Sequence, residues 1–179
     1  LEYHIDKKAE ITVVCTRPGD EVDASRYGIV SHDETGRITR FDEKPLGKIP
    51  ENPLISAGIY VIRRRLLIEL LETAHEEERN DLVRDIIIRY LDMKRIFAYE
   101  HKDYWCNIAS VEDYFRANMD FHKKDIRDYF FRQYPDVYSK VDDLPPAKYN
   151  SSADVRNSLV ASGTIVNGKV ENSVVFKQV

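Results

Sequence analysis

A carboxylate and an ammonium group follow one another at Glu43 and Lys44, directly before Pro45. A proline ring disfavours helical backbone angles for the preceding residue, so we expect Lys44 to be extended and both side chains to stand off a strand end. A carboxylate accepts hydrogen bonds from hydroxyl groups, and lysine presents a compact charge to a phosphate. The pair therefore suits a phosphorylated sugar, although in a chain that is 32% charged it also fits an ordinary solvated turn.

A β-hairpin is predicted immediately before this pair. Residues 27–31 and 37–41 are rich in β-branched and aromatic side chains, as strands are. The polar run between them, from Asp33 to Gly36, supplies the glycine that a hairpin loop needs. The pair is therefore expected at the end of the second hairpin strand.

A loop and a third strand are predicted after the pair. The segment LGKIPEN, which lies between Pro45 and Pro53, contains another proline and a glycine, and this favours an exposed loop that can move over a pocket. Residues 55–62 return as a strand that contains the small-residue run SAG, beginning at Ser56. Small residues here leave room for a ligand, or alternatively for close packing of the sheet against a helix.

Five segments in fixed order carry a family resemblance. They are RYGIV, FDEKP, ISAGIYV, DYWCNIASVEDYFRANMD and LPPAKY. As a set they resemble the later part of bacterial ADP-glucose pyrophosphorylases, also called glucose-1-phosphate adenylyltransferases, the sugar nucleotidyltransferases that start glycogen synthesis. The resemblance implies an α/β fold: the later part of a Rossmann-like nucleotidyltransferase domain, with a mixed sheet and helices.

The same resemblance implies a substrate site in this chain. It places Gly28, Glu43, Lys44 and Ser56 in a pocket for glucose 1-phosphate or the sugar of ADP-glucose. Lys44 would meet the phosphate, Glu43 would meet the sugar hydroxyls, and Gly28 would let the sugar nucleotide approach the backbone.

The resemblance also implies a weakened metal site. Where catalytic members read Tyr-Trp-x-Asp-(Val/Ile)-Gly-Thr, residues 104–110 read YWCNIAS, so Asn107 replaces the metal-binding aspartate. Mg²⁺ is held through one or two carboxylates plus substrate phosphates, and an amide offers an oxygen without the charge. We expect Mg²⁺ in the complete family enzyme but not on this chain, and we assign it no catalytic residue and no metal ligand.

Three further residues are expected to support the pocket from behind. Arg84 and Asp85 fall where the family has a lysine and an aspartate near the active site, and Trp105 precedes the altered metal position. Arginine keeps the charge of lysine but not its geometry. The family's glycine-rich nucleotide loop and its other metal aspartate would lie before Leu1, so the chain is expected to be a C-terminal fragment.

The remaining hydrophobic patterns predict strands and helices in alternation. Strands are expected over 11–15 (buried on both faces), 95–100 and 104–108, and helices over 66–74 and 82–91. Ser110 and Asp113 have the spacing that caps the start of another helix.

Three regions are expected along the chain. Residues 1–143 form the partial nucleotidyltransferase domain, 144–152 a linker, and 153–179 the start of a left-handed parallel β-helix. In the last region apolar residues recur six apart, as in hexapeptide repeats. The aromatic residues within 125–143 lie among mixed charges, which favours a linker packed on the domain over a nucleic-acid stacking platform.

Composition limits the partners and the compartment. The net charge of −4 provides no basic face, which argues against nucleic acid, and no apolar run approaches the ~20 residues of a membrane span. These features are typical of a soluble cytoplasmic protein. Cys15 and Cys106 have no metal-ligand spacing and are expected to be buried reduced thiols, with a reactive Cys106 as the alternative.

Three functions fit these observations. The chain is a regulatory, weakly or non-catalytic subunit that assembles with a catalytic homologue or with itself; or it is a catalytic adenylyltransferase subunit; or it is a non-enzymatic oligomerisation module with a vestigial sugar-phosphate pocket. The substitution at Asn107 favours the first. Related transferases that use guanylyl or thymidylyl donors also remain compatible.

Overall fold

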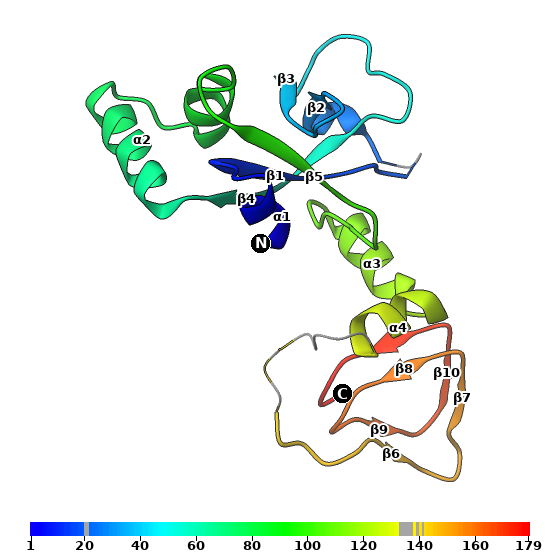
Figure 1. Ribbon diagram of the computed structural model, residues 1–179. Helices are drawn as coiled ribbons and strands as arrows, with labels where there is room; N and C mark the ends of the chain where they lie inside the picture. The colour runs from blue at the N-terminus through cyan, green and yellow to red at the C-terminus, as the bar shows by residue number, and fades with distance from the viewer. Residues whose placement is uncertain (20–21, 133–137, 139, 141) are drawn as a thin grey trace. The chain divides into compact units, whose positions relative to one another are not determined.

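The chain forms two compact units, Leu1–Trp105 and Cys106–Val179, which are described separately (Figure 1). The computed structural model describes residues 1–19, 22–132, 138, 140 and 142–179. The domain limits expected at residues 143 and 153 stay a prediction. None of the helices within these described ranges is both long and apolar enough to span a membrane.

A five-stranded mixed sheet forms the centre of the first unit (Figure 1). The strands are β1 (Ile11–Thr16), β2 (Gly28–His32), β3 (Ile38–Glu43), β4 (Ile55–Ile62) and β5 (Ile96–His101). Their order is β3-β2-β4-β1-β5; β1 is parallel to β5, and the other neighbours are antiparallel. The mixed sheet with helices is the fold class expected from the sequence.

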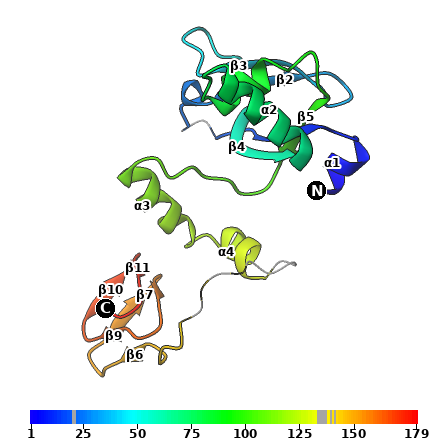
Figure 2. The same cartoon turned by 90° about the vertical axis from the view of Figure 1, so that its left-hand side faces the viewer.

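Two helices cover one face of this sheet (Figure 2). Leu66 and Leu70 lie one turn apart on α2 (Arg64–Glu76), and they share one apolar cluster with Ile86 and Ile87 of η2 (Leu82–Ile88) and with residues of β1 and β5. Burying each such side chain contributes about 1.5–3 kcal/mol to stability. The cluster therefore holds both helices against the sheet.

Two short elements complete the first unit. In α1 (Glu2–Asp6) the hydroxyl of Tyr3 donates a hydrogen bond to the carbonyl oxygen of Ala98 in β5, at 2.8 Å. The single turn η1 (Ala24–Arg26) leads into β2.

The predicted hairpin is confirmed as β2 and β3. At its turn, one carboxylate oxygen of Asp33 accepts hydrogen bonds from the backbone N–H groups of Thr35 (2.8 Å) and Arg37 (3.1 Å). Gly36 has φ +87°, a left-handed conformation that suits glycine. β3 extends to Glu43, so Glu43 and Lys44 do lie at the end of this strand.

Two predicted elements differ in the structure. The expected helix over 82–91 is a π-helix that ends at Ile88, and Ile86 and Ile87 in it are buried in the core. The expected strand over 104–108 is wrong: these residues, all described, have no regular structure. The Trp105 ring packs into an apolar cluster with Ile29 and Ile55 instead.

The second unit begins with α3 (Val111–Asp120) and α4 (Lys124–Phe131). The predicted cap is confirmed, because the hydroxyl oxygen of Ser110 accepts a hydrogen bond from the N–H of Asp113 at 3.1 Å. Residues 125–131, which were expected within a linker packed on the domain, are helical instead, and the rings of Phe130 and Phe131 pack on Phe121, with ring centroids 5.3 and 5.9 Å away. The expected aromatic Tyr134 lies outside the described residues.

The end of the chain forms short strands that pair in parallel: β6 (Lys148–Tyr149) with β9 (Ile165–Val166), β7 (Asp154–Arg156) with β10 (Lys169–Glu171), and β8 (Leu159–Val160) with β11 (Val174–Val175). Asn157 and Asn172, 15 residues apart, stack at one corner, with the side-chain amide of Asn157 donating to the other at 2.7 Å. Both have positive φ (+41° and +47°), which asparagine tolerates well.

Candidate functional site

Glu43 is the last residue of β3 and lies opposite Gly28 of β2 in the hairpin register. Its side chain is only 18% exposed, whereas that of Lys44 is 64% exposed. The ammonium nitrogen of Lys44 is 3.9 Å from a carboxylate oxygen of Glu43. The half-buried carboxylate is thus held in place by the strand, while the ammonium is accessible to an anion.

Lys44 is not extended, which corrects the expectation from Pro45. Its φ is +48°, in the left-handed region, and its N–H donates to the carbonyl oxygen of Tyr27 at 3.3 Å. The proline disfavours the right-handed helical conformation, and the observed left-handed one lets the N–H of Lys44 make the last hydrogen bond of the hairpin. A side chain in this region costs roughly 1–2 kcal/mol, so the residue is held in a strained conformation.

Gly28 is required by packing in the structure. The ring of Phe41 and the carboxylate of Glu43 lie directly over its Cα, so position 28 has no room for a side chain. The close approach of a sugar nucleotide to Gly28, which the family resemblance implies, stays a prediction. Phe41 was not predicted as part of the site; it pairs with Val30, and the sequence signal is an aromatic residue placed diagonally across a hairpin from a strand glycine.

Ser56 begins a bulge in β4. Cys15 pairs with Ser56 while the neighbouring Val14 pairs with Ile59, so Ala57 and Gly58 are left out of the ladder. Gly58 has φ +73°, its N–H donates to the hydroxyl oxygen of Ser56 at 3.3 Å, and the space where its side chain would stand is open. The space at Gly58 is therefore open, and room for a ligand beside this small-residue run stays a prediction.

Tyr60 lies next to Ser56, and the sequence analysis did not predict it as a site residue. Its hydroxyl oxygen is 3.5 Å from that of Ser56. Burial raises the pKa of Tyr60, and the nearby carboxylates of Glu43 and Asp81 raise it further, while the hydrogen bond with Ser56 opposes them. Tyr60 is therefore a polar group of β4 that contacts Ser56 and senses the charge of Glu43 at the end of β3.

A groove of about 670 Å³ lies beside Glu43. The residues that decide its charge are Arg40, Asp42, Glu43, Lys48 and Arg84. Arg40 is paired with Asp42 at 2.7 Å, whereas no ion pair within the described part of the chain involves Lys48 or Arg84. The groove therefore offers two cations for an anionic group, one of them from η2.

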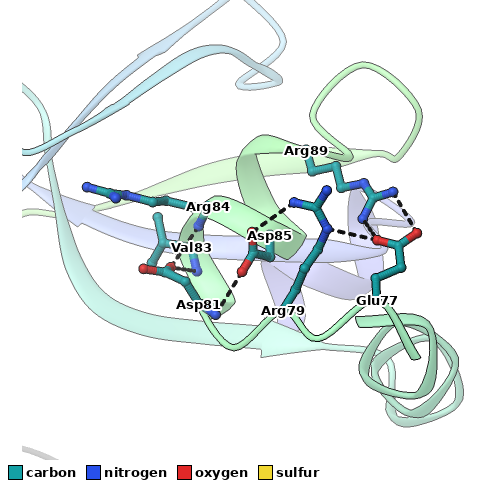
Figure 3. Close-up of polar contacts among 7 residues, drawn as sticks. All are labelled: Glu77, Arg79, Asp81, Val83, Arg84, Asp85 and Arg89. Atoms are coloured by element: carbon teal, nitrogen blue, oxygen red, sulfur yellow. Dashed lines mark hydrogen bonds and ion pairs between the residues drawn. The ribbon is translucent and has the colours of Figure 1, made fainter. Parts of the chain in front are cut away.

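Of the three residues expected behind the pocket, Arg84 lines this groove and Asp85 does not. Figure 3 shows the contacts of Asp85. The carboxylate of Asp85 accepts hydrogen bonds from the N–H of Asp81 at 2.9 Å and from the guanidinium of Arg79 at 3.4 Å. The third, Trp105, meets the ring of Tyr27 edge-on, with centroids 5.7 Å apart.

Asn107 is exposed and belongs to the second unit, so its role in metal binding stays a prediction. Cys106 is also exposed, which corrects the expectation of burial; the strand that would have buried it does not form. Cys15 is buried as expected, and burial raises the pKa of its thiol to about 12. Among the residues that the structure describes, no three His, Cys, Asp or Glu gather as a metal site.

Comparison with known proteins agrees with this picture. The family model for the nucleotidyl transferase family matches residues 1–124. Curated relatives named glucose-1-phosphate adenylyltransferase are similar along nearly the whole chain. The one from Bacillus subtilis (strain 168) is 39% identical over 182 residues, covering 100% of this chain and 47% of the relative. Those from Clostridium acetobutylicum and Lachnospira eligens are 38% and 34% identical, covering 98% of this chain and 46% and 41% of their own lengths.

This chain spans about half the length of the curated relatives it matches. The family match covers well over half of the chain, and the mixed α/β sheet fits it. The chain therefore belongs to the nucleotidyl transferase family of enzymes.

Proposed function

We propose that this chain supplies the glucose 1-phosphate site of a glucose-1-phosphate adenylyltransferase. In that reaction a phosphate oxygen of glucose 1-phosphate attacks the α-phosphorus of ATP, a new P–O bond forms, and pyrophosphate leaves to give ADP-glucose. The relatives carry this activity in their names. The observation that most directly supports this proposal is the half-buried Glu43 beside the accessible Lys44 at the end of β3.

The geometry suits a hydroxyl-rich anion. The carboxylate of Glu43 accepts hydrogen bonds from sugar hydroxyls, and the hydroxyls of Ser56 and Tyr60, which lie 3.5 Å apart, are further polar groups for the sugar. Lys44 supplies the cation for the phosphate. Holding the attacking phosphate in place and neutralising its charge are the main contributions that a protein makes to such a transfer.

The described residues do not assemble a metal site by themselves, so we derive from them only the binding of the sugar phosphate. Mg²⁺ would be held in the complete enzyme chiefly by nucleotide phosphates and carboxylates. The amide of Asn107 in place of the family's aspartate supports a regulatory, weakly or non-catalytic subunit, and this chain would then function with a catalytic homologue or with copies of itself.

Measuring turnover distinguishes a regulatory subunit from a catalytic one. The full-length protein is assayed for ADP-glucose with Mg²⁺, and the Asn107→Asp variant is assayed in parallel. A regulatory subunit gives negligible turnover that the aspartate raises. Appreciable turnover by the unmodified protein would identify a catalytic subunit.

We further propose that residues 153–179 begin a left-handed parallel β-helix in which the chain meets further coils or another subunit, and that the protein works in the cytoplasm as part of glycogen biosynthesis. The parallel pairing of short strands 15 or 17 residues apart supports a coil.

Calorimetric titration of the full chain with glucose 1-phosphate tests the proposed site. Saturable binding is expected, with weaker binding of glucose and of inorganic phosphate, because each of these fills only half of the site. If neither glucose 1-phosphate nor ADP-glucose gives heat, the non-enzymatic oligomerisation module becomes the better assignment.

A further inference from the structure

A chain of ion pairs joins the end of α2 to the middle and the end of η2 (Figure 3). Glu77 accepts hydrogen bonds from both outer nitrogens of the Arg89 guanidinium, one of them at 3.0 Å. Arg79 donates to Glu77 at 2.9 Å and to Asp85 at 3.4 Å. We call Glu77, Arg79, Asp85 and Arg89 the anchor network.

The anchor network holds η2 at its start, middle and end. Asp85 accepts from the N–H of Asp81, and Asp81 in turn accepts from the N–H groups of Val83 and Arg84, both at 2.8 Å. Arg89 follows the last residue of the π-helix. Hydrogen bonds with Arg89 and with the backbone of Asp81 keep the pKa values of Glu77 and Asp85, respectively, below their ordinary values, so both acids are ionised at neutral pH.

Arg84 leaves η2 in a different direction from the anchor network. In Figure 3 its side chain extends away from Glu77, Arg79 and Arg89. It lines the groove beside Glu43 together with Ile88, one turn further along η2. A rotation of η2 about its axis would therefore move the Arg84 guanidinium out of the groove.

The anchor network supplies direction as well as stability. Its ion pairs are solvent-accessible; a single exposed pair contributes little to the free energy of folding, and a bidentate contact within a network contributes more. The buried Ile86 and Ile87 already attach η2 to the sheet, but apolar packing is non-directional. The two-pronged contact between Arg89 and Glu77 is directional, and such contacts specify orientation.

We propose that Glu77, Arg79, Asp85 and Arg89 are positioning residues, which fix the rotation of η2 so that Arg84 meets the phosphate of the bound sugar ester. The inference rests on the proposed function, because it assigns a device to the groove that shares Glu43 with the proposed site. Asp81 is positioned by the same device, since its N–H is bound to Asp85.

The first test compares two glutamate variants on α2 or at its end. Glu77→Gln removes the charge that binds Arg79 and Arg89, and Glu69→Gln removes the exposed ion pair with Arg65 as a matched control. We expect Glu77→Gln to weaken glucose 1-phosphate binding on the order of tenfold, because the guanidinium is misplaced, and Glu69→Gln to leave it unchanged. Unchanged binding by Glu77→Gln would overturn the proposal.

The second test asks whether the effect passes through Arg84. In an Arg84→Ala background, Glu77→Gln should produce no further loss of affinity, since the group that it positions is already absent. The same loss in both backgrounds would show that Glu77 acts in another way and would contradict the proposal.

Hydrogen exchange separates failure of this inference from failure of the proposed function. Glu77→Gln should make amide exchange over residues 82–88 about tenfold faster, whereas Glu69→Gln should not. Unprotected wild-type amides or unaltered exchange in Glu77→Gln would refute positioning. If the exchange changes as expected but the wild-type chain binds no sugar phosphate, the proposed function is wrong. The conclusion that the anchor network holds η2 in place would still be supported.

Discussion

Gly28 lies directly beneath the ring of Phe41: a Cβ at position 28 would come within 2.4 Å of Phe41 Cε1 and 2.9 Å of the Glu43 carboxylate. Real Cβ atoms do not approach other atoms this closely, so any side chain must displace the ring, the carboxylate or the strand. The glycine, the aromatic ring and the Glu43 carboxylate are therefore one packed unit.

Gly28→Ala should destabilise the fold by about 1–3 kcal/mol because of overpacking, and it should also weaken glucose 1-phosphate binding by moving Glu43. Urea unfolding and calorimetry measure the two effects. Gly168→Ala is the control, since no atom lies within 4 Å of a side chain there. Phe41→Leu combined with Gly28→Ala should recover part of the stability; a fully stable single variant would contradict the packing described.

The backbone of Lys44 is strained, so replacing this residue with glycine should raise the stability of the fold and lower its affinity for the sugar phosphate. Lys44→Gly should relieve the left-handed φ of +48° and stabilise the fold by up to about 1 kcal/mol, while it lowers affinity for the sugar phosphate. Lys8 has φ +49° and is also exposed, so Lys8→Gly should give a similar stabilisation without loss of binding. Thermal unfolding measures the stability of both variants, and calorimetry measures their affinity. Equal losses of affinity in Lys44→Gly and Lys8→Gly would show that the charge of Lys44 does not bind the phosphate.

Tyr60 should make stability sensitive to alkaline pH. Its pKa in the folded chain is raised above the ordinary 10.0, first by burial, so the folded state holds the proton more tightly than the unfolded state. This contribution is fully present below pH 10 and is lost as the pH rises through the folded pKa. Urea unfolding at pH 9 and pH 11 should show a smaller loss of stability in Tyr60→Phe than in the wild type. An identical loss of stability in both proteins would contradict the assignment of this pH dependence to Tyr60.

The hairpin and the place of Glu43 could be predicted from the sequence because both depend on local signals. Alternation of side chains and the Gly36 turn set the hairpin register, and this register leaves Glu43 at its end. The backbone of Lys44 could not be predicted, since the proline rule favours an extended residue, whereas the observed left-handed one makes a hydrogen bond to Tyr27.

Tyr60 was missed for a different reason. In a regular strand, residues four apart are separated by about 13 Å, so Ser56 and Tyr60 would not interact. The bulge at Ala57 and Gly58 takes two residues out of the ladder and brings the two hydroxyls to 3.5 Å. A glycine inside a strand pattern was the available signal, but the depth of a bulge depends on pairing with β1.

The most direct test of the sugar-phosphate site is the affinity of the full chain for glucose 1-phosphate, measured by calorimetry in Lys44→Ala and Lys8→Ala. A hydrogen bond to a charged group contributes about 1.5–3 kcal/mol, so Lys44→Ala should weaken binding roughly ten- to a hundredfold. Lys8→Ala changes the same residue type in the same backbone conformation and should bind like the wild type. Equal affinities in both variants would contradict the assignment of Lys44 to the phosphate.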